Sequence, residues 1–378
     1  MIPFGIFLYC PPYRILLHYT VTMRGIDFPI FKTKVDGGTS FQLEDPADRR
    51  KYFEFKAGTE IEKLRDWLRT NTFVAFLMGK KNAGKGTYTK LFMEAVEAEH
   101  VAHISVGDIV RSVHKELGTE GSKKELLDFL KKKYRGFITP EKALDIITGR
   151  DTKTLLPTEV ILALVERQID RIGRKAIFID GFPRNLDQIS YSLYFRALIG
   201  YRDDPDFFAF IDLPERVIDE RMRYRVVCPK CQTPRNLKLL STKEVGYDEA
   251  KKEFYLMCDN PLCGNARMVS KEGDGLGIEA IRDRIELDDK VMRMLMDLQG
   301  VPKIFLRNSI PVDQAKEYVD AYEITPGYRY EFDSATKNVR VIEEPWTVKD
   351  DNGVTSYSLL PAAVVLSLIK QMVQVLGL

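Results

Sequence analysis

The sequence predicts an α/β fold built around a parallel β-sheet that is flanked by helices. Four short apolar runs each lead through turn residues into a longer segment with helical periodicity. Such runs are typical of strands buried on both faces, and parallel sheets bury both faces under helices. The four predicted strands are 73–78, 101–104, 176–180 and 207–212.

Two helices of this core are well defined, because their apolar residues recur at intervals of three and four. The first follows strand 73–78 and carries Tyr88, Leu91, Phe92, Ala95 and Val96 on one face. The second ends the chain, and we expect its apolar stripe to pack in the core. That stripe contains Val365, Leu368, Ile369, Met372 and Leu376.

An N-terminal extension of unknown role, residues 1–70, precedes the core. We predict a helix over 59–69 and short strands within 28–56, and we expect the extension to pack on the core or to form an interface. Residues 1–22 are apolar but are interrupted by prolines and charges, and they have no basic segment typical of a signal peptide. We therefore expect translation to begin at Met23, which leaves Cys10 outside the natural protein.

The composition excludes several classes of protein. Of 378 residues, 44% are hydrophobic, and 57 Lys and Arg oppose 55 Asp and Glu. The hydrophobic fraction argues against a disordered chain. The nearly equal numbers of positive and negative residues argue against a protein whose main role is to bind the phosphates of nucleic acids. The most apolar C-terminal stretch, 359–369, is too short to cross a bilayer. We expect a cytoplasmic monomer with neither nucleic-acid nor membrane partners.

A glycine-rich loop follows the first predicted strand, in the sequence FVAFLMGKKNAGKGT over 73–87. Glycines let backbone N–H groups surround a phosphate, and the positive end of the next helix points at it. Lys85 can then reach the β and γ oxygens of a nucleotide. The strict motif has Ser or Thr directly after this lysine, whereas here Gly86 precedes Thr87.

A carboxylate ends the third predicted strand. Asp180 lies at the carboxyl edge of the sheet, where it can hold Mg²⁺ through water molecules next to a phosphate loop. Gly181, Phe182, Pro183 and Arg184 follow directly.

Four blocks in this order resemble the adenylate kinases, which are nucleoside monophosphate kinases: 79–87, 103–111 (HISVGDIVR), 180–188 (DGFPRNLDQ) and 220–225 (ERMRYR). The resemblance implies a P-loop NMP kinase fold with a central parallel five-stranded sheet. It also implies Mg²⁺-dependent phosphoryl transfer from ATP to a nucleoside monophosphate. It covers about residues 73–300 and the closing strand and helix. It does not cover 1–70 or the insertions at 118–155 and 307–327, of which the first is helical in pattern. The tail beyond contains a strand-like segment at 328–332.

The resemblance also implies site residues. The reacting groups would be Lys85, Arg184, Arg225, Arg284 and Asp180, with Asp108 assisting Asp180 at Mg²⁺. Phosphoryl transfer rests on positioning and charge neutralisation, and arginine binds phosphate oxygens in pairs. ATP would contact Gly79, Asn82, Ala83, Gly84, Lys85, Gly86, Thr87, Arg221 and Arg225. The monophosphate would contact Val106, Arg111, Gly181, Phe182, Pro183, Arg184, Gln188 and Arg284.

Three positions depart from the family pattern. Lys81-Asn82 replaces Pro-Gly in the loop, and Val106 replaces a threonine. An arginine expected about 11 residues before Arg284 falls on Gly273, with Lys271 nearby, which puts charge neutralisation in doubt.

The identity of the monophosphate depends on Gln188, which matches a glutamine that reads adenine in adenylate kinases. An amide side chain can read adenine because it pairs with the donor and the acceptor on the edge of that base. AMP is therefore favoured. The neighbouring Arg184-Asn185 is similar to the UMP/CMP kinase branch, so a pyrimidine or broad specificity stays open.

Four cysteines form two close pairs, C-x2-C and C-x4-C: Cys228, Cys231, Cys258 and Cys263. This layout is typical of a four-cysteine zinc site, in which a structural Zn²⁺ fills all its positions with protein ligands. Disulfides or no site are the alternatives. The cysteines lie where the family carries its mobile lid.

The predicted organisation is therefore a kinase core over 71–225 and 276–378, with a monophosphate-binding insertion at about 105–160. A zinc-binding, ribbon-like lid would span 226–275. The competing hypothesis is a nucleotide-gated module whose zinc ribbon binds nucleic acid.

Overall fold

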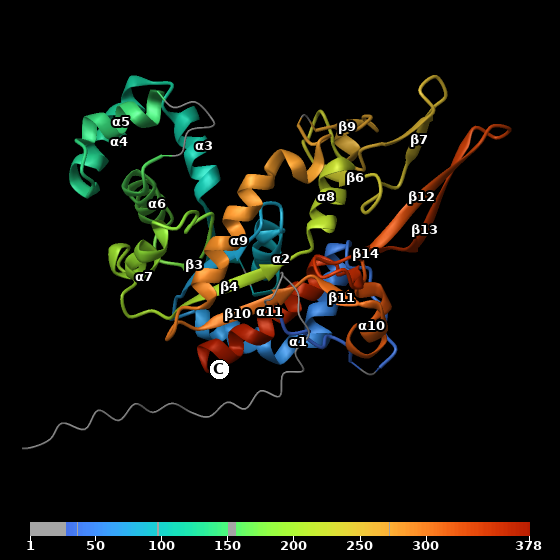
Figure 1. The fold of residues 1–378 in the computed structure, drawn as a ribbon, viewed down its shortest axis with the longest axis horizontal. Helices are drawn as coiled ribbons and strands as arrows, with labels where there is room; N and C mark the ends of the chain where they lie inside the picture. Colours follow the sequence, from blue (N-terminus) through green and yellow to red (C-terminus); the bar gives the residue numbers. More distant parts are fainter. Residues whose placement is uncertain (1–27, 36, 97, 150–155, 272) are drawn as a thin grey trace, which may run out of the picture.

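The computed structural model describes residues 28–35, 37–96, 98–149, 156–271 and 273–378 (Figure 1). The expected start at Met23 and the stray Cys10 lie outside the described residues.

A five-stranded parallel sheet forms the centre of the molecule, as the sequence predicts. Its order is β10-β4-β1-β3-β2, with the strand that leads into the glycine-rich loop in the middle. All four predicted strands are confirmed within a residue or so, and the fifth, β10, was not among the predicted runs. The bounds are β1 (Val74–Gly79), β2 (Val101–Ser105), β3 (Ala176–Asp180), β4 (Asp206–Asp212) and β10 (Lys303–Arg307).

Alternate residues of each strand enter two separate cores. Phe73, Ala75 and Leu77 pack into one core, whereas Val74 and Phe76 pack into the other. Helices α1 (Pro46–Leu68), α2 (Lys85–Val96) and α11 (Pro361–Leu376) belong to the first core. Helices α3 (Val106–Glu116), α6 (Thr158–Ile172), α7 (Gln188–Leu198) and part of α9 (Arg282–Met296) belong to the second. The predicted burial of the stripe on α11 is confirmed, with Leu376 only partly buried.

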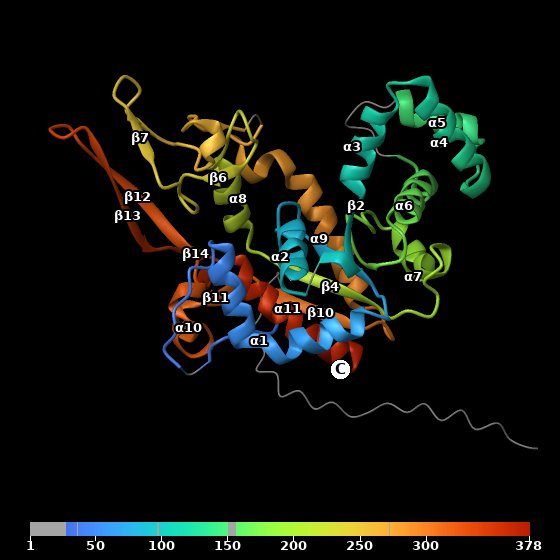
Figure 2. The same cartoon turned by 180° about the vertical axis from the view of Figure 1, so that it is seen from behind.

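The described residues of 28–56 contain no strand, because helix α1 begins at Pro46 and the residues before it are irregular. The prediction of short strands within that range is therefore wrong. Helix α1 starts at Pro46 because Asp45 caps it, accepting bonds from the N–H groups of Ala47 and Asp48. It continues through a kink at Ala57 into the predicted helix 59–69. It packs on α11 and α2 (Figure 2), so the extension adds a layer to the core.

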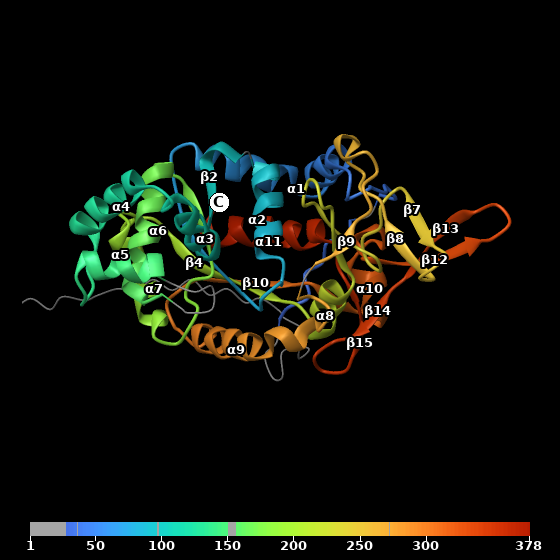
Figure 3. The same ribbon diagram turned by 90° about the horizontal axis from the view of Figure 1, so that it is seen from above.

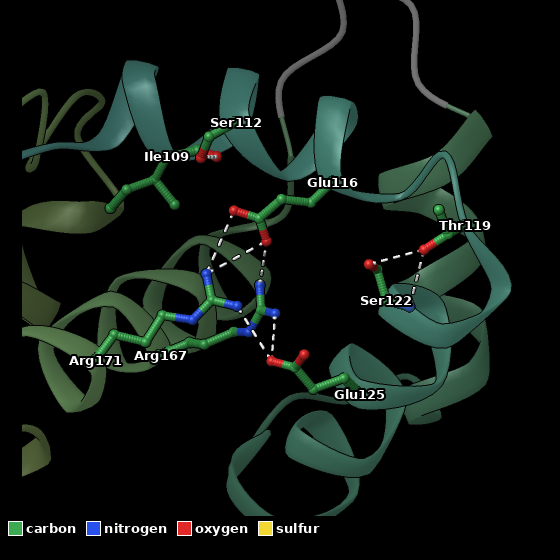
Figure 4. A network of polar contacts seen from close by, with 8 residues as sticks. All are labelled: Ile109, Ser112, Glu116, Thr119, Ser122, Glu125, Arg167 and Arg171. Atoms are coloured by element: carbon green, nitrogen blue, oxygen red, sulfur yellow. Dashed lines mark hydrogen bonds and ion pairs between the residues drawn. The ribbon is translucent and has the colours of Figure 1, made fainter.

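The lysine-rich insertion forms the helices that its pattern predicts, α4 (Glu120–Lys133) and α5 (Pro140–Gly149), while residues 150–155 lie outside the described part. Two arginines of α6 bind this insertion through carboxylates of α3 and α4 (Figure 4). Arg167 lies 3.2 Å from Glu116 and 3.0 Å from Glu125, and Arg171 contacts the same two groups. Helices α3, α4 and α6 are thereby joined into one unit.

The cysteine segment, residues 226–275, follows α8 (Glu215–Arg223) and forms two small sheets. One contains β5 (Arg225–Val227), β6 (Pro234–Asn236) and β9 (Val269–Ser270), and the other is the hairpin β7 (Val245–Asp248) and β8 (Glu253–Leu256). Figure 3 shows this segment and the α3–α5 segment at opposite ends of the molecule.

The insertion expected at 307–327 extends to about residue 360. It contains β11 (Ser309–Pro311), α10 (Val312–Tyr318), β12 (Pro326–Asp333), β13 (Asn338–Pro345), β14 (Thr347–Lys349) and β15 (Thr355–Ser358). The predicted strand at 328–332 is confirmed as part of β12. The hairpin β12–β13 projects from the core beside β7 (Figures 1 and 2).

Among the described residues, no helix combines the length and apolar character that a bilayer crossing requires.

Candidate active site

The glycine-rich loop connects β1 to α2 in a conformation that its small residues permit. A Cβ added to Gly79 would lie 3.2 Å from the backbone oxygen of Ile211, so a side chain there would press against β4. Gly84 has φ of +93°. Asn82, which replaces a glycine of the family pattern, has φ of +67°, a conformation that Asn tolerates better than most residues.

Lys85 is the first residue of α2, and its ammonium is turned back into the loop. Its Nζ donates to the backbone oxygens of Gly79 at 2.8 Å and Lys80 at 3.1 Å. It also lies 3.8 Å from Asp180 Oδ1. The lysine and the strand-end carboxylate therefore face each other beside the N-terminus of a helix, where the helix dipole favours anions.

A cavity of about 300 Å³ opens at this point, beyond the carboxyl ends of β1 and β3. Most of the predicted reacting groups meet in its wall. The predicted residues that line it are Gly79, Asn82, Lys85, Arg111, Asp180, Gly181, Pro183, Arg184 and Arg284. Arg284 donates to the backbone oxygen of Arg184 at 3.1 Å, which connects α9 to the segment after β3. Together with Lys81, which lines the same wall, these residues bring five cations to one cavity, which suits a polyphosphate.

Other predicted residues lie outside the cavity wall. Ala83, Gly84, Gly86 and Thr87 belong to the loop and to the first turn of α2. Val106 and Phe182 are buried in the core around α3 and α7. The carboxylate of Asp108 is 69% exposed and pairs with Arg111. Of the two carboxylates predicted at Mg²⁺, only Asp180 lines the cavity.

Two predicted arginines lie at the foot of the cysteine segment. Arg221 is close to the hydroxyl of Tyr88, whose pKa is raised by burial against the opposing effect of this arginine. Arg225 is paired with Asp274, through Nε at 2.5 Å and Nη2 at 2.8 Å. A bound phosphate would have to compete with this carboxylate for Arg225.

Gln188 also lies outside the cavity and is 2% exposed. Its Oε1 accepts from the backbone N–H of Arg184 at 2.8 Å, and its Nε2 donates to Thr158 Oγ1 at 3.2 Å. Both amide atoms are thus bonded within the protein, and reading a base would require them to exchange partners.

The cavity contains residues to which the sequence assigned no role. Ser105 caps the N-terminus of α3, Gly107 lies in its first turn, and Asp288 stands four residues after Arg284 on α9. Asp288 pairs with Arg284 at 2.6 Å and accepts from the backbone N–H of Lys81 at 2.9 Å. Burial raises its pKa, against the lowering effect of Arg284 and Lys85. The four-residue spacing to Arg284 was the one signal in the sequence that could have identified it.

The four clustered cysteines come together in space. Their Sγ atoms all lie within 4.8 Å of one another, and none of the four is in a disulfide. Tetrahedral Zn²⁺ with bonds of about 2.3 Å needs sulfurs about 3.8 Å apart, and Cys231 lies 3.6 Å from Cys258. The hydroxyl and backbone N–H of Thr233 lower the pKa of Cys231 to about 6. Four free thiols at this separation fit a zinc ion, which would bind them as thiolates.

Several known adenylate kinases are similar in sequence to this chain, although no family model matches it. The adenylate kinase of Clostridium novyi is 30% identical over 222 residues, which are 58% of this chain and 83% of that protein. The adenylate kinase of Clostridium tetani is 28% identical over 251 residues, 65% of this chain and 94% of that protein. That of Thermotoga neapolitana is 27% identical over 236 residues, 62% and 88% respectively. The chain belongs to the adenylate kinase family of nucleoside monophosphate kinases.

Proposed function

We propose that this kinase transfers the γ-phosphoryl group of ATP to AMP, with Mg²⁺, and forms two ADP. The observation that supports it is the convergence of Lys85, Arg111, Arg184 and Arg284 with Asp180 in one cavity. Phosphoryl transfer asks for positioned cations around the transferred group and for little covalent chemistry.

The roles follow from these positions. Lys85, Arg184 and Arg284 stabilise the charge of the transferring group, and Arg225 joins them after it leaves Asp274. Asp180 would hold Mg²⁺ through water, with Asp108 assisting from the rim. The ion would neutralise charge on the ATP phosphates.

The flanking segments are proposed as the moving parts. The cysteine segment would be a lid whose structural Zn²⁺ is held by Cys228, Cys231, Cys258 and Cys263. The segment 105–160 would bind the monophosphate. Their closure would exclude water, which otherwise competes for the phosphoryl group. During closure, Arg225 and Gln188 would exchange their present partners in the protein for atoms of the nucleotides.

AMP is the proposed acceptor because the amide of Gln188 offers both a donor and an acceptor to adenine. A panel of AMP, dAMP, CMP, UMP and GMP with MgATP, with formation of the diphosphates followed, tests this choice. AMP should be preferred, and Gln188→Leu should reduce turnover of AMP more than turnover of CMP. A preference for CMP or UMP would contradict this choice and would make a pyrimidine monophosphate the acceptor.

Two variants test the assignment of the cavity. Lys85→Ala and Arg184→Ala should abolish turnover while leaving thermal unfolding near that of the wild type. Lys63→Ala, an exposed lysine on α1, serves as the control and should keep full activity. Near-normal turnover by either cavity variant would contradict the assignment. Chelation of Mg²⁺ should stop the reaction reversibly.

A further inference from the structure

Lys81 is a cation in the cavity wall that the roles above do not use. Its side chain is exposed and lines the cavity with Lys85, Arg184 and Arg284. No carboxylate of the part of the chain that the structure describes lies within 4.0 Å of its Nζ. Its neighbour Lys80 differs sharply, because it is 2% exposed and pairs with Asp351 at 2.6 Å. Of these two adjacent loop lysines, one is an internal ion-pair partner and the other faces the substrate cavity.

The backbone at Lys81 is fixed by Asp288. The N–H of Lys81 donates to Oδ2 of Asp288 at 2.9 Å, while Oδ1 of the same carboxylate pairs with Arg284 at 2.6 Å. A proline, which the family pattern has at this position, has no N–H to donate. Asp288 therefore joins the phosphate loop to α9 at the residue where this chain departs from that pattern.

The charges around Lys81 favour an anion in the cavity. Partial burial of its ammonium lowers the pKa of Lys81, and Arg184 and Arg284 lower it further, against the raising effect of Asp288. The ammonium is thus close enough to two guanidinium groups to be repelled by them. Phosphate oxygens placed between these three cations would relieve that repulsion.

We propose that Lys81 is a catalytic residue whose ammonium contacts the phosphate oxygens of the bound nucleotides. It provides, from the loop side, a cation in the cavity of a chain whose lid has Gly273 where an arginine was expected. In the reaction the bond from the γ-phosphorus to the β,γ-bridging oxygen breaks, and a bond from that phosphorus to an oxygen of the monophosphate forms. Lys81 neither gives nor takes a proton and acts by charge. This inference rests on the proposed function.

Kinetics of four variants test it: Lys81→Gln, Lys81→Arg, Lys271→Gln and Lys63→Gln. Loss of one charge-assisted contact should lower kcat/KM for MgATP about 10- to 100-fold in Lys81→Gln. Lys81→Arg, which keeps the charge, should stay within about threefold of the wild type. Lys271→Gln, the lid lysine near Gly273, and the α1 control should both be unaffected. Wild-type kinetics of Lys81→Gln, or a loss in Lys271→Gln instead, would overturn the proposal.

A second measurement does not depend on turnover. In the wild-type protein with ¹³C-labelled lysine, the Lys81 resonance is assigned from its absence in Lys81→Arg, and its pKa is followed without and with MgATP. Contact with phosphate should raise this pKa, and an unchanged value would overturn the proposal. If no monophosphate is phosphorylated, the proposed function fails, while this titration still decides whether Lys81 meets the phosphates.

Discussion

A buried ionic network joins the N-terminal extension to the C-terminal insertion, and its central residue is Lys56 of α1. The Lys56 side chain is fully buried, and its Nζ donates to Thr33 O at 3.0 Å, Asp320 Oδ2 at 2.6 Å and Glu323 Oε1 at 2.8 Å. Tyr52 also donates to Glu323, at 2.5 Å. Burial and the Glu323 carboxylate raise the pKa of Tyr52, so its hydroxyl stays protonated and keeps donating at neutral pH.

Lys56→Met removes the ammonium and keeps most of the apolar stem. Glu323 is also fully buried and would lose its cation, although the hydroxyls of Tyr52 and Thr33 remain. Breaking a buried pair on one side costs about 3–5 kcal/mol. In a chain of this length that corresponds to a fall in Tm of about 4–6 °C. Calorimetry and chemical unfolding of the variant measure it.

Two further variants make the result specific. Lys63→Met removes an exposed lysine of the same helix and should change stability by less than about 0.5 kcal/mol. In the double variant Lys56→Met/Glu323→Gln neither charge of the pair remains. Its loss of unfolding free energy should therefore be smaller, by about 1 kcal/mol or more, than the summed losses of Lys56→Met and Glu323→Gln. The reasoning is refuted if Lys56→Met is as stable as Lys63→Met, or if the single costs simply add.

Three other segments give testable outcomes. Arg167→Met should speed proteolytic cleavage in 118–149 more than Arg171→Met does, because Arg167 is 7% exposed and Arg171 is 40% exposed; equal rates would contradict the network. Metal analysis should find one Zn²⁺ per chain, and a strong chelator should speed hydrogen exchange in 226–275, as should Cys231→Ser; no bound metal would exclude the zinc site. Phe332→Ala, which loses a ring stacked at 4.3 Å on Tyr247, should speed exchange in β7–β8, whereas the exposed-site control Val341→Ala should not.

The sequence predicts the sheet and the phosphate loop because both depend on short, contiguous patterns. Strands β1 to β4 are apolar runs whose burial leaves a clear signature. The edge strand β10 pairs with β4 alone, and its sequence KIFLR offers only three apolar residues between two cations. Strands were expected in 28–56 because its residues partly alternate, whereas Asp45 caps a helix there and Pro46 occupies its first position.

The sequence predicts which residues form the candidate site, but it does not predict which other residues they contact. Lys85, Asp180, Arg184 and Arg284 meet as expected, because strand ends and the following loops lie at one edge of a parallel sheet. Arg225 pairs with a carboxylate 49 positions further along the chain, and Asp288 contacts a loop 207 positions away. Contacts over such separations are set by tertiary packing, which local patterns in the sequence do not encode.

The contacts between the hairpin β12–β13 and the cysteine segment bear on how a lid could move. Tyr330 packs against the small core around the cysteines, and its hydroxyl donates to Leu237 O at 2.7 Å. At the tip, Lys337 pairs with Glu249 at 2.7 Å. The base of the hairpin is attached to the kinase core, where Ile324 bridges to Leu359 just before α11. Rotation of the segment over the cavity must therefore bend the hairpin or break these contacts. Since the Lys56 network fixes Glu323 directly before that bridge, the added segments at the two ends of the chain together set the position from which any lid closure starts.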